Sequence, residues 1–389
     1  MKRPKYDVGA VVRQHLQEIW SSNKFTVHQK RMLQAIADCR TPALGKRELA
    51  CTDCGHIQYT YNSCRNRNCP KCQARDREAW IKAREQELLP VTYFHVVFTL
   101  PEALNPLCRS HPKLLYNCLF RCAWYTINKL GKDPNWIGAQ TAMTAVLHTW
   151  GSNLSLHPHV HCIVPGGGLS VEGKWIKARS DGKYLFNRQV MGLIFRAKFV
   201  RDLRKLIKKG QIPLQAAPSA LFSNLFKQQW ITYAKRPFVG PNAVIQYLGR
   251  YSHKVAITNY RIVKVTDRQV FFRWKDYRSN GKQKVMKLSS WEFIRRFAMH
   301  IVPHKFVRFR HYGILANRHK KIKLQDCRKA LSVQNPVQSK KISEINRPLS
   351  EVEQFAFCNC CKKITIHQVL DILPPIRGDP SKKKLLNIR

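Results

Sequence analysis

The stretch "LSLHPHVHCIV" at residues 154–164 carries three histidines at alternate positions, His157, His159 and His161. Side chains two residues apart project from the same face of a β-strand. The positions between these histidines are apolar and can face another surface. The spacing therefore predicts a strand with an apolar face and an imidazole face, which constrains the fold to include a sheet with one functional side.

Two imidazoles on this face could converge on one metal ion. Neighbouring members of the series lie roughly 6.6 Å apart along a strand, and the outer pair about twice as far, so we do not expect one ion to bind all three. His159 and His161 are the predicted pair, because Pro158 disturbs the strand before them. The third ligand remains open between His148, on the expected partner strand, and His157. The alternative is a set of structural histidines.

The charge of the chain indicates a polyanionic partner. Its 389 residues include 69 Lys and Arg but only 23 Asp and Glu, a formal net charge of +46. A surplus of this size repels itself unless it meets a polyanion, and nucleic acid is the leading candidate. A basic membrane-surface protein is the weaker alternative, because no amphipathic anchor stands out.

Nothing in the sequence predicts secretion or membrane insertion. The first ten residues, "MKRPKYDVGA", are basic but lack the apolar run of a signal peptide. Apolar stretches such as "YFHVVFTL" are far too short to span a bilayer. We expect a cytoplasmic protein that associates with the bacterial nucleoid, with no membrane partner.

Cysteines predict a structural zinc site near the N-terminus. The chain has 14 cysteines, and "CTDCGHIQYTYNSCRNRNCPKC" contains the pairs Cys51-x-x-Cys54 and Cys69-x-x-Cys72. Two such pairs can supply four thiolates to a tetrahedral zinc ion. Cys64 is a spare thiol that could replace one ligand. Reduced, buried cysteines are the alternative to a metal site.

The surroundings of these cysteines favour DNA. Arg65, Arg67 and Lys71 lie among the predicted ligands, and we expect them to contact phosphates. The chain ends with another cysteine cluster at 358–361, which contains a single C-x-x-C pair. His367 is the nearest additional ligand, and the cluster receives no firm assignment.

A pair of tyrosines could supply a nucleophile. Tyr247 and Tyr251 are four residues apart, so on a helix both phenols would lie on one face. A phenol attacks phosphorus only when a metal or cation stabilises the charge that develops. Arg250, His253 and Lys254 lie beside the pair and could hold a phosphate. Taken alone, aromatic residues at this spacing are more often core.

The remaining pattern predicts a mixed α and β chain. Helices are expected within 10–45 and at about 73–89, 103–131, 188–209 and 219–235, with a short one after Pro241. Strands are expected at 92–100, 144–150 with 154–164 as a hairpin, and within 255–289.

Several stretches together resemble the HUH rolling-circle, two-tyrosine transposases of insertion-sequence ninety-one type. They run in family order from about residue 10 to 330 and include "CTDCGHIQYTYNSCRNRNCPKCQ", "FHVVFTLP", "LHTWGSNLSLHPHVHCIVPGGG", "YLGRYSHKVAITNYRI" and "EFIRRFAMHIVPHKFVRFRHYGILANR". Asn68, where we would expect His in relatives, departs from the pattern.

The resemblance implies an α+β fold in which a helical and zinc-ribbon domain (1–90) precedes an HUH endonuclease domain (91–310). That domain would have an antiparallel sheet with a ferredoxin/RRM-like core, followed by a basic C-terminal extension (311–389). His159 and His161 match the family's metal ligands, and Tyr247 and Tyr251 its nucleophiles.

The activity implied is cleavage and rejoining of single-stranded DNA at mobile-element ends, through 5′-phosphotyrosine links, with Mg²⁺ or Mn²⁺ as catalytic ion and target DNA as the second partner. A transposase that uses three catalytic carboxylates is a weaker alternative, because the chain has only 23 acidic residues and no compelling acidic trio. A metal-dependent hydrolase of small molecules would not explain the net charge of +46. The non-enzymatic alternative is a zinc-ribbon DNA- or RNA-binding protein. The oligomeric state, a monomer included, and the DNA sequence stay open.

Overall fold

The computed structural model describes residues 4–72, 81, 83–179, 184–213, 218–230, 232–234, 238, 243–244, 247, 249, 254–333 and 353–373. The chain forms two compact units that interleave along the sequence. We call residues 1–75, 257–301 and 336–389 the terminal unit, and residues 76–256 with 302–335 the central unit. The three consecutive segments expected from the sequence therefore differ from the division that the structure shows.

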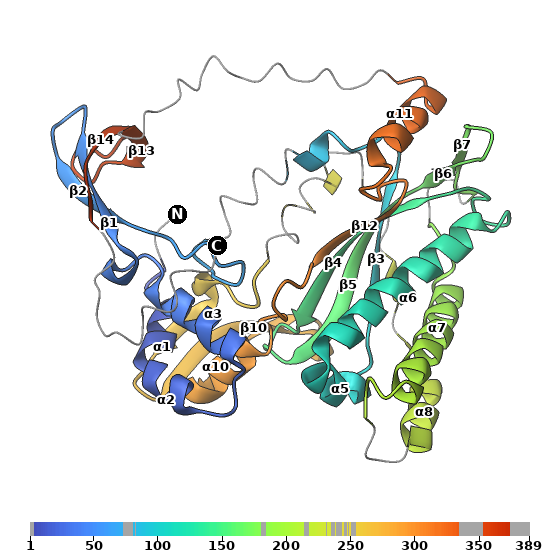
Figure 1. Cartoon of the computed structure of the whole chain (residues 1–389), viewed down its shortest axis with the longest axis horizontal. Coiled ribbons are helices and arrows are strands. Elements are labelled where there is room, and N and C mark those ends of the chain that lie inside the picture. The colour runs from blue at the N-terminus through green and yellow to red at the C-terminus, as the bar shows by residue number, and fades with distance from the viewer. Residues whose placement is uncertain are drawn as a thin grey trace. The chain divides into compact units, whose positions relative to one another are not determined.

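The central unit is built on a five-stranded sheet (Figure 1). Its strand order is β12 (Phe309–Gly313), β4 (Ala142–Trp150), β5 (Leu156–Pro165), β3 (Tyr93–Thr99) and β8 (Thr232–Ala234). Every neighbouring pair is antiparallel. The predicted β4–β5 hairpin and the predicted strand at 92–100 are both confirmed, and β5 lies in the middle of the sheet.

Helices cover one face of this sheet. The long helices α6 (Pro112–Lys132) and α7 (Arg188–Lys208) pack against it, and the buried core joins Val160 of β5 and Phe98 of β3 to Phe120 and Phe195 on the helices. Because side chains alternate along a strand, the histidines of β5 project from the opposite face. The two helices thus bury the apolar face of β5 and do not cover its imidazole face.

Local sequence explains where these helices begin. Asn187 caps α7 by accepting hydrogen bonds from the backbone N–H groups of Gln189 and Val190. The helix predicted at 103–131 is divided into α5 (Asn105–Ser110) and α6, since Pro112 starts a new helix and cannot continue the previous one.

One helix is shorter than the sequence predicts. The expected helix at 219–235 ends early: α8 spans Pro218–Lys227, and 232–234 instead pairs with β3. The free edge of β3 offers backbone hydrogen bonds that outweigh local helix propensity. The central unit also contains β6 (Gly167–Leu169), β7 (Trp175–Lys177) and α11 (Lys320–Ala330).

The terminal unit contains an N-terminal group of helices and two sheets. The region predicted as helical forms α1 (Val8–Gln14), α2 (Leu16–Ser21) and α3 (Val27–Asp38), and Thr26 caps α3 with a reciprocal bond from Gln29. A three-stranded sheet contains β9 (Ile262–Val265), β10 (Gln269–Asp276) and β11 (Lys282–Ser289), and α10 (Ser290–Ala298) follows it.

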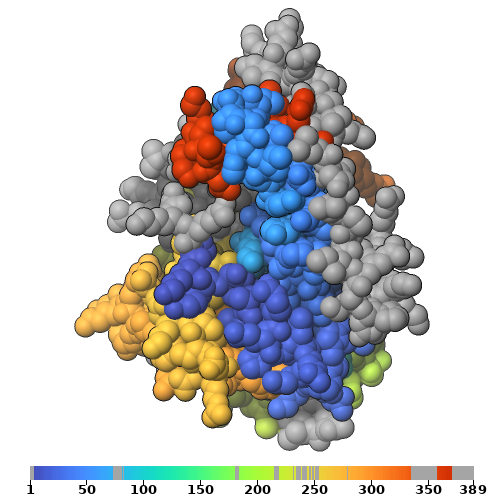
Figure 2. Space-filling view, turned by 90° about the vertical axis from the view of Figure 1, so that its left-hand side faces the viewer, coloured from blue at the N-terminus to red at the C-terminus, as the bar shows by residue number. Residues whose placement is uncertain are grey.

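The second sheet of the terminal unit joins distant parts of the chain. Its order is β13 (Glu353–Phe357), β14 (Ile364–Leu373), β1 (Lys46–Cys51) and β2 (Ile57–Tyr61), all antiparallel. Figure 2 shows the red C-terminal hairpin beside the light-blue N-terminal hairpin. Short 3₁₀ turns lie at Pro42–Leu44, Glu102–Leu104, Asn259–Arg261 and Tyr277–Ser279. No described helix is long and apolar enough to cross a bilayer.

The sheet core should dominate the stability of the central unit. Leu147 of β4 is fully buried next to His148, so we expect Leu147→Ala to lower the free energy of unfolding by about 2–5 kcal/mol. Leu193→Ala on α7 is the matched control, because Leu193 is 54% exposed and its truncation should change stability by about 0.5 kcal/mol or less. Denaturant unfolding of both variants tests this, and equal costs would contradict the burial pattern.

Candidate active site and cysteine clusters

Three imidazoles meet on the face of the central sheet opposite α6 and α7. His148 of β4 lies directly opposite His159 of β5 in the antiparallel register, and His161 is the next residue along on the same face. One nitrogen from each ring lies within 4.8 Å of the others. The structure therefore groups His148, and not His157, with His159 and His161.

The hydrogen bonds of His159 and His161 orient their rings. Nδ1 of His159 lies 2.6 Å from the carbonyl oxygen of His157, so Nδ1 carries the proton and Nε2 presents its lone pair. The Nε2 atoms of His159 and His161 are 3.1 Å apart. Two ligands at right angles around an ion about 2.1 Å away are separated by about 3 Å, which this spacing matches. His157 thus acts through its backbone, while its ring lies outside the group.

Electrostatics keep these imidazoles neutral. Burial lowers the pKa of His159 to about 3, and burial also lowers the pKa of His161 well below its usual value. The positive charge of Lys254 contributes to both shifts, which places this lysine near the imidazole face. A neutral imidazole is the form that binds metal.

A tyrosine reaches the same site. The Tyr247 hydroxyl lies 3.1 Å from Nδ1 of His161 and 2.6 Å from Nε2 of His95. His95 stacks on His161 with ring centroids 5.1 Å apart, and their nitrogens approach to 2.9 Å. His161 therefore faces His159 with one nitrogen and the phenol with the other, which couples the candidate metal position to the candidate nucleophile.

His95 is a site residue that the sequence reasoning missed. It lies on β3, is 3% exposed, and contacts both Tyr247 and His161. Its signal was a single histidine in the largely apolar run "YFHVVFTL", on the same strand face as Tyr93 and Val97. A lone histidine in such a run does not reveal its partners, because those come from β5 and from residue 247.

Of the residues near the tyrosines that were predicted to act on DNA, the structure describes Lys254. Tyr251, Arg250 and His253 lie outside the described residues. Lys254 is exposed, and its carbonyl oxygen accepts a hydrogen bond from Arg308. The Arg308 guanidinium also lies 5.4 Å from the ring of Trp150.

Trp150 in turn stacks on His148 at 4.7 Å. Cationic side chains therefore accompany the imidazole cluster.

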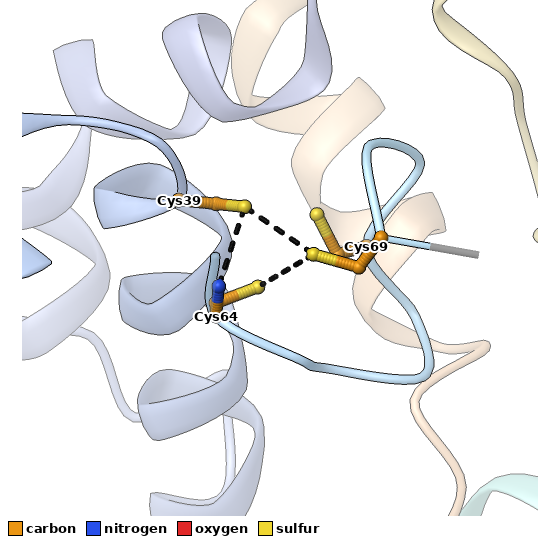
Figure 3. Close-up of side chains that lie close together, drawn as sticks. Cys39, Cys64 and Cys69 are labelled. Atoms are coloured by element: carbon orange, nitrogen blue, oxygen red, sulfur yellow. Dashed lines mark hydrogen bonds between the residues drawn. The ribbon is translucent and has the colours of Figure 1, made fainter. Parts of the chain in front are cut away.

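The first cysteine cluster contains Cys39, Cys64, Cys69 and Cys72, with all four sulfurs within 4.8 Å of one another. Figure 3 shows Cys39, Cys64 and Cys69 converging on one point. The sulfur of Cys72 lies 3.4 Å from that of Cys39 and 3.7 Å from that of Cys64. Sulfurs bound tetrahedrally at 2.3 Å from zinc are about 3.8 Å apart, so the cluster has nearly the required size.

The second cysteine cluster contains Cys51, Cys54, Cys358 and Cys361. The sulfurs of Cys54 and Cys358 are 3.6 Å apart, and those of Cys51 and Cys361 are 3.9 Å apart. His367 lies outside the cluster, because its ring contacts Gln58 and the carbonyl oxygen of Thr365.

These clusters correct the grouping expected from the sequence, which combined Cys51 and Cys54 with Cys69 and Cys72. The β1–β14 pairing brings the C-terminal C-x-x-C pair to Cys51 and Cys54. The chain after β2 returns to the end of α3, where Cys39 is the C-terminal cap. The pair Cys51 and Cys54 therefore meets a C-x-x-C pair that is distant in sequence, and the pair Cys69 and Cys72 meets two single cysteines.

The basic residues near the first cluster have different surroundings. Arg65 is exposed, whereas Arg67 and Lys71 are half-buried. Lys71 forms an ion pair with Asp7 at 3.2 Å. Burial lowers the pKa of the Arg67 guanidinium. The most accessible of the three is thus Arg65.

The geometry predicts different roles for the neighbouring histidines. We expect His148→Ala to weaken Mn²⁺ binding at this site by about tenfold or more, because a ligand is lost. His157→Ala should leave affinity within about threefold, because the carbonyl oxygen that orients His159 remains. Electron paramagnetic resonance titration with Mn²⁺ measures both. Equal losses in the two variants would contradict the assignment.

Two family models match the chain. A family model described as "Putative transposase" matches residues 142–323, which include the imidazole cluster and Tyr247. A model described as "Transposase zinc-binding domain" matches residues 11–100, which include the first cysteine cluster. No solved structure matches the chain.

Two curated relatives span most of the chain. It is 44% identical over 321 residues to "Putative transposase y4qJ" of Sinorhizobium fredii, covering 80% of each protein. It is 30% identical over 286 residues to the transposase for insertion sequence element IS801 of Pseudomonas savastanoi pv. phaseolicola, covering 72% of this chain and 68% of that protein. The chain therefore belongs to the IS91 family of transposases.

Proposed function

We propose that this transposase cleaves and rejoins single-stranded DNA at the ends of a mobile element by an HUH-type mechanism, with Tyr247 as a nucleophile and a divalent ion on His148, His159 and His161. The observation that carries the proposal is the shared position of His161. Its Nε2 faces His159, and its Nδ1 lies 3.1 Å from the Tyr247 hydroxyl. Nucleophile and metal ligands thereby meet around one ring.

The three ligands fit a catalytic metal site with open coordination positions better than a structural site whose positions are all filled by protein. Three imidazole ligands leave positions for phosphate oxygens and water. When Mg²⁺ or Mn²⁺ is bound there, it would polarise the scissile phosphate and stabilise the charge on its non-bridging oxygens. The structure supports this with the 3.1 Å separation of the His159 and His161 Nε2 atoms.

The chain's own residues would carry out the bond exchange. The Tyr247 oxygen attacks phosphorus and its phenolic proton passes to Nε2 of His95, which lies 2.6 Å away. The bond from phosphorus to the 3′ oxygen breaks, and that oxygen leaves as a hydroxyl by taking a proton from solvent water, while His95 later returns its proton to solvent. The product is a 5′-phosphotyrosine, which keeps the energy of the broken bond for later rejoining.

Tyr251 would serve as the second nucleophile in a later strand exchange. Lys254, with Arg250 and His253, would hold the phosphate backbone. The net charge of +46 supports a nucleic-acid substrate, because each neutralised phosphate releases counterions. In the terminal unit, zinc on the first cysteine cluster would support a DNA-binding surface that includes Arg65.

The non-catalytic alternative is a zinc-ribbon protein that binds DNA or RNA without cutting it. A purely structural role does not require the Tyr247 hydroxyl to lie within hydrogen-bond distance of both His95 and His161. It also predicts binding that does not depend on either tyrosine.

A covalent adduct separates the two functions. With Mg²⁺ or Mn²⁺ and labelled single-stranded DNA carrying an element end, the protein should form an adduct that resists denaturing electrophoresis. Tyr247→Phe/Tyr251→Phe should abolish the adduct and keep DNA binding within about threefold, because only two hydroxyl groups are lost. Tyr260→Phe, an exposed tyrosine of the terminal unit, is the control. Failure of the wild-type protein to form an adduct with several genuine ends, while binding them, would overturn the proposal.

His95 should affect the reaction through the phenol. We expect His95→Gln to slow adduct formation by about 10–100-fold, because it removes the imidazole that would accept the proton of the Tyr247 hydroxyl. Mn²⁺ affinity and DNA binding should change little, which separates this role from metal ligation. His319→Gln at an exposed position provides the control. An unchanged adduct rate in His95→Gln would rule out the role.

A further inference from the structure

The second cysteine cluster joins the two ends of the chain. Cys54 and Cys358 are 304 residues apart in sequence, yet their sulfurs are 3.6 Å apart. Two of the four cysteines lie outside residues 11–100, the range that matches the zinc-binding family model. The cluster is also separate from the imidazole site, which belongs to the central unit.

The two halves of this cluster have the same backbone structure. In the N-terminal half, the Cys51 N–H donates to the His56 carbonyl oxygen and the Gly55 N–H donates to that of Cys51. In the C-terminal half, the Cys358 N–H donates to the Lys363 carbonyl oxygen and the Lys362 N–H donates to that of Cys358. The sequence separations of donor and acceptor are the same in both halves. Two matching turns that aim four thiols at one point form the knuckle pair of a tetrahedral zinc site.

Backbone conformation gives a second, independent indication. The residue after each C-x-x-C pair has a positive φ, +68° at Gly55 and +60° at Lys362. Glycine adopts this conformation freely, whereas the Cβ atom of a lysine makes it sterically unfavourable. A strained residue persists where its surroundings determine the conformation, and a bound ion that fixes Cys358 and Cys361 would provide that constraint.

Polar contacts align the two knuckles. Gln58 of β2 donates to the Phe357 carbonyl oxygen at 2.8 Å and accepts from the Asn359 N–H at 3.2 Å. The Thr365 hydroxyl donates to Asp53 at 2.8 Å. These bonds connect the N-terminal hairpin to the C-terminal one on both sides of the cysteines, so the convergence of the sulfurs is specified by neighbouring residues.

Few of the described side chains of the β13–β14 hairpin are buried. Within its described side chains, the buried residues are Cys358, His367 and Val369. A two-stranded hairpin is at best marginally stable in water, and small domains with too little core are commonly completed by a metal. An ion bound at the cysteines would add stability to the attachment of this hairpin to β1.

We propose that a second zinc ion, bound by Cys51, Cys54, Cys358 and Cys361, fastens the C-terminal hairpin to the N-terminal one and completes a zinc ribbon whose halves come from opposite ends of the chain. The ion closes a loop that contains the whole central unit, so the ribbon forms only after the catalytic part has been synthesised. This proposal is independent of the chemistry at Tyr247.

Metal content tests the ligand set. The full-length protein should bind about two structural zinc ions, and Cys358→Ser/Cys361→Ser should bind about one. Cys360→Ser is the matched control, because Cys360 is exposed in the same hairpin and lies outside the cluster, and it should keep both ions. Cys358→His, which retains a zinc ligand, should also keep both. Full zinc content in Cys358→Ser/Cys361→Ser would overturn the proposal.

Cadmium-113 NMR shows whether the rest of the protein stays folded. The cadmium-substituted protein should give two resonances of tetrathiolate type. Cys358→Ser/Cys361→Ser should lose one and keep the other, which arises from the first cluster. Retention of both resonances would overturn the assignment.

A cut chain tests the fastening itself. A specific protease site inserted within residues 334–352 allows the C-terminal fragment to be separated covalently from the rest of the full-length protein. After cleavage the fragment should co-elute with the remainder in gel filtration and dissociate when a strong chelator removes zinc. Co-elution that survives complete removal of zinc would show that the metal does not fasten the hairpin.

Discussion

The position of β5 in the middle of the central sheet is the constraint on which the candidate active site depends. Its Val160 side faces the helices α6 and α7, and its His159 side faces away from them. Both faces are therefore determined at once, because a shift of one residue in register would bury imidazoles in the core and expose valines. Flanking strands then add His148 and His95 to the same surface.

Placing imidazoles on a half-buried sheet face also determines their chemistry. Burial and the nearby charge of Lys254 lower the pKa values of His159 and His161, so these rings stay neutral in a protein with a large positive charge. Neutral rings bind a cation, whereas protonated rings would repel it. The same basic surroundings attract the phosphates on which such a cation acts.

Local sequence patterns predicted the parts of the structure that depend on local rules. Alternation predicted β5 and the face shared by its histidines, and helical periodicity predicted α7. The sequence could not predict which distant elements meet. His95 and Tyr247 are 152 residues apart, and no spacing rule connects them. The cysteine pairs were grouped by proximity in sequence, whereas the β1–β14 pairing groups them by proximity in space.

The cysteine clusters also bear on how a strongly basic unit stays compact. Four thiolates around one Zn²⁺ carry a net charge of about −2, so each occupied cluster would place negative charge among basic residues. Arg40 and Lys71 lie beside the first cluster, and Lys362 and Lys363 follow the second. Buried ion pairs need scarce acidic residues, of which the chain has few. Zinc–thiolate centres would offset the repulsion from within the fold and leave the outer basic surface available for DNA.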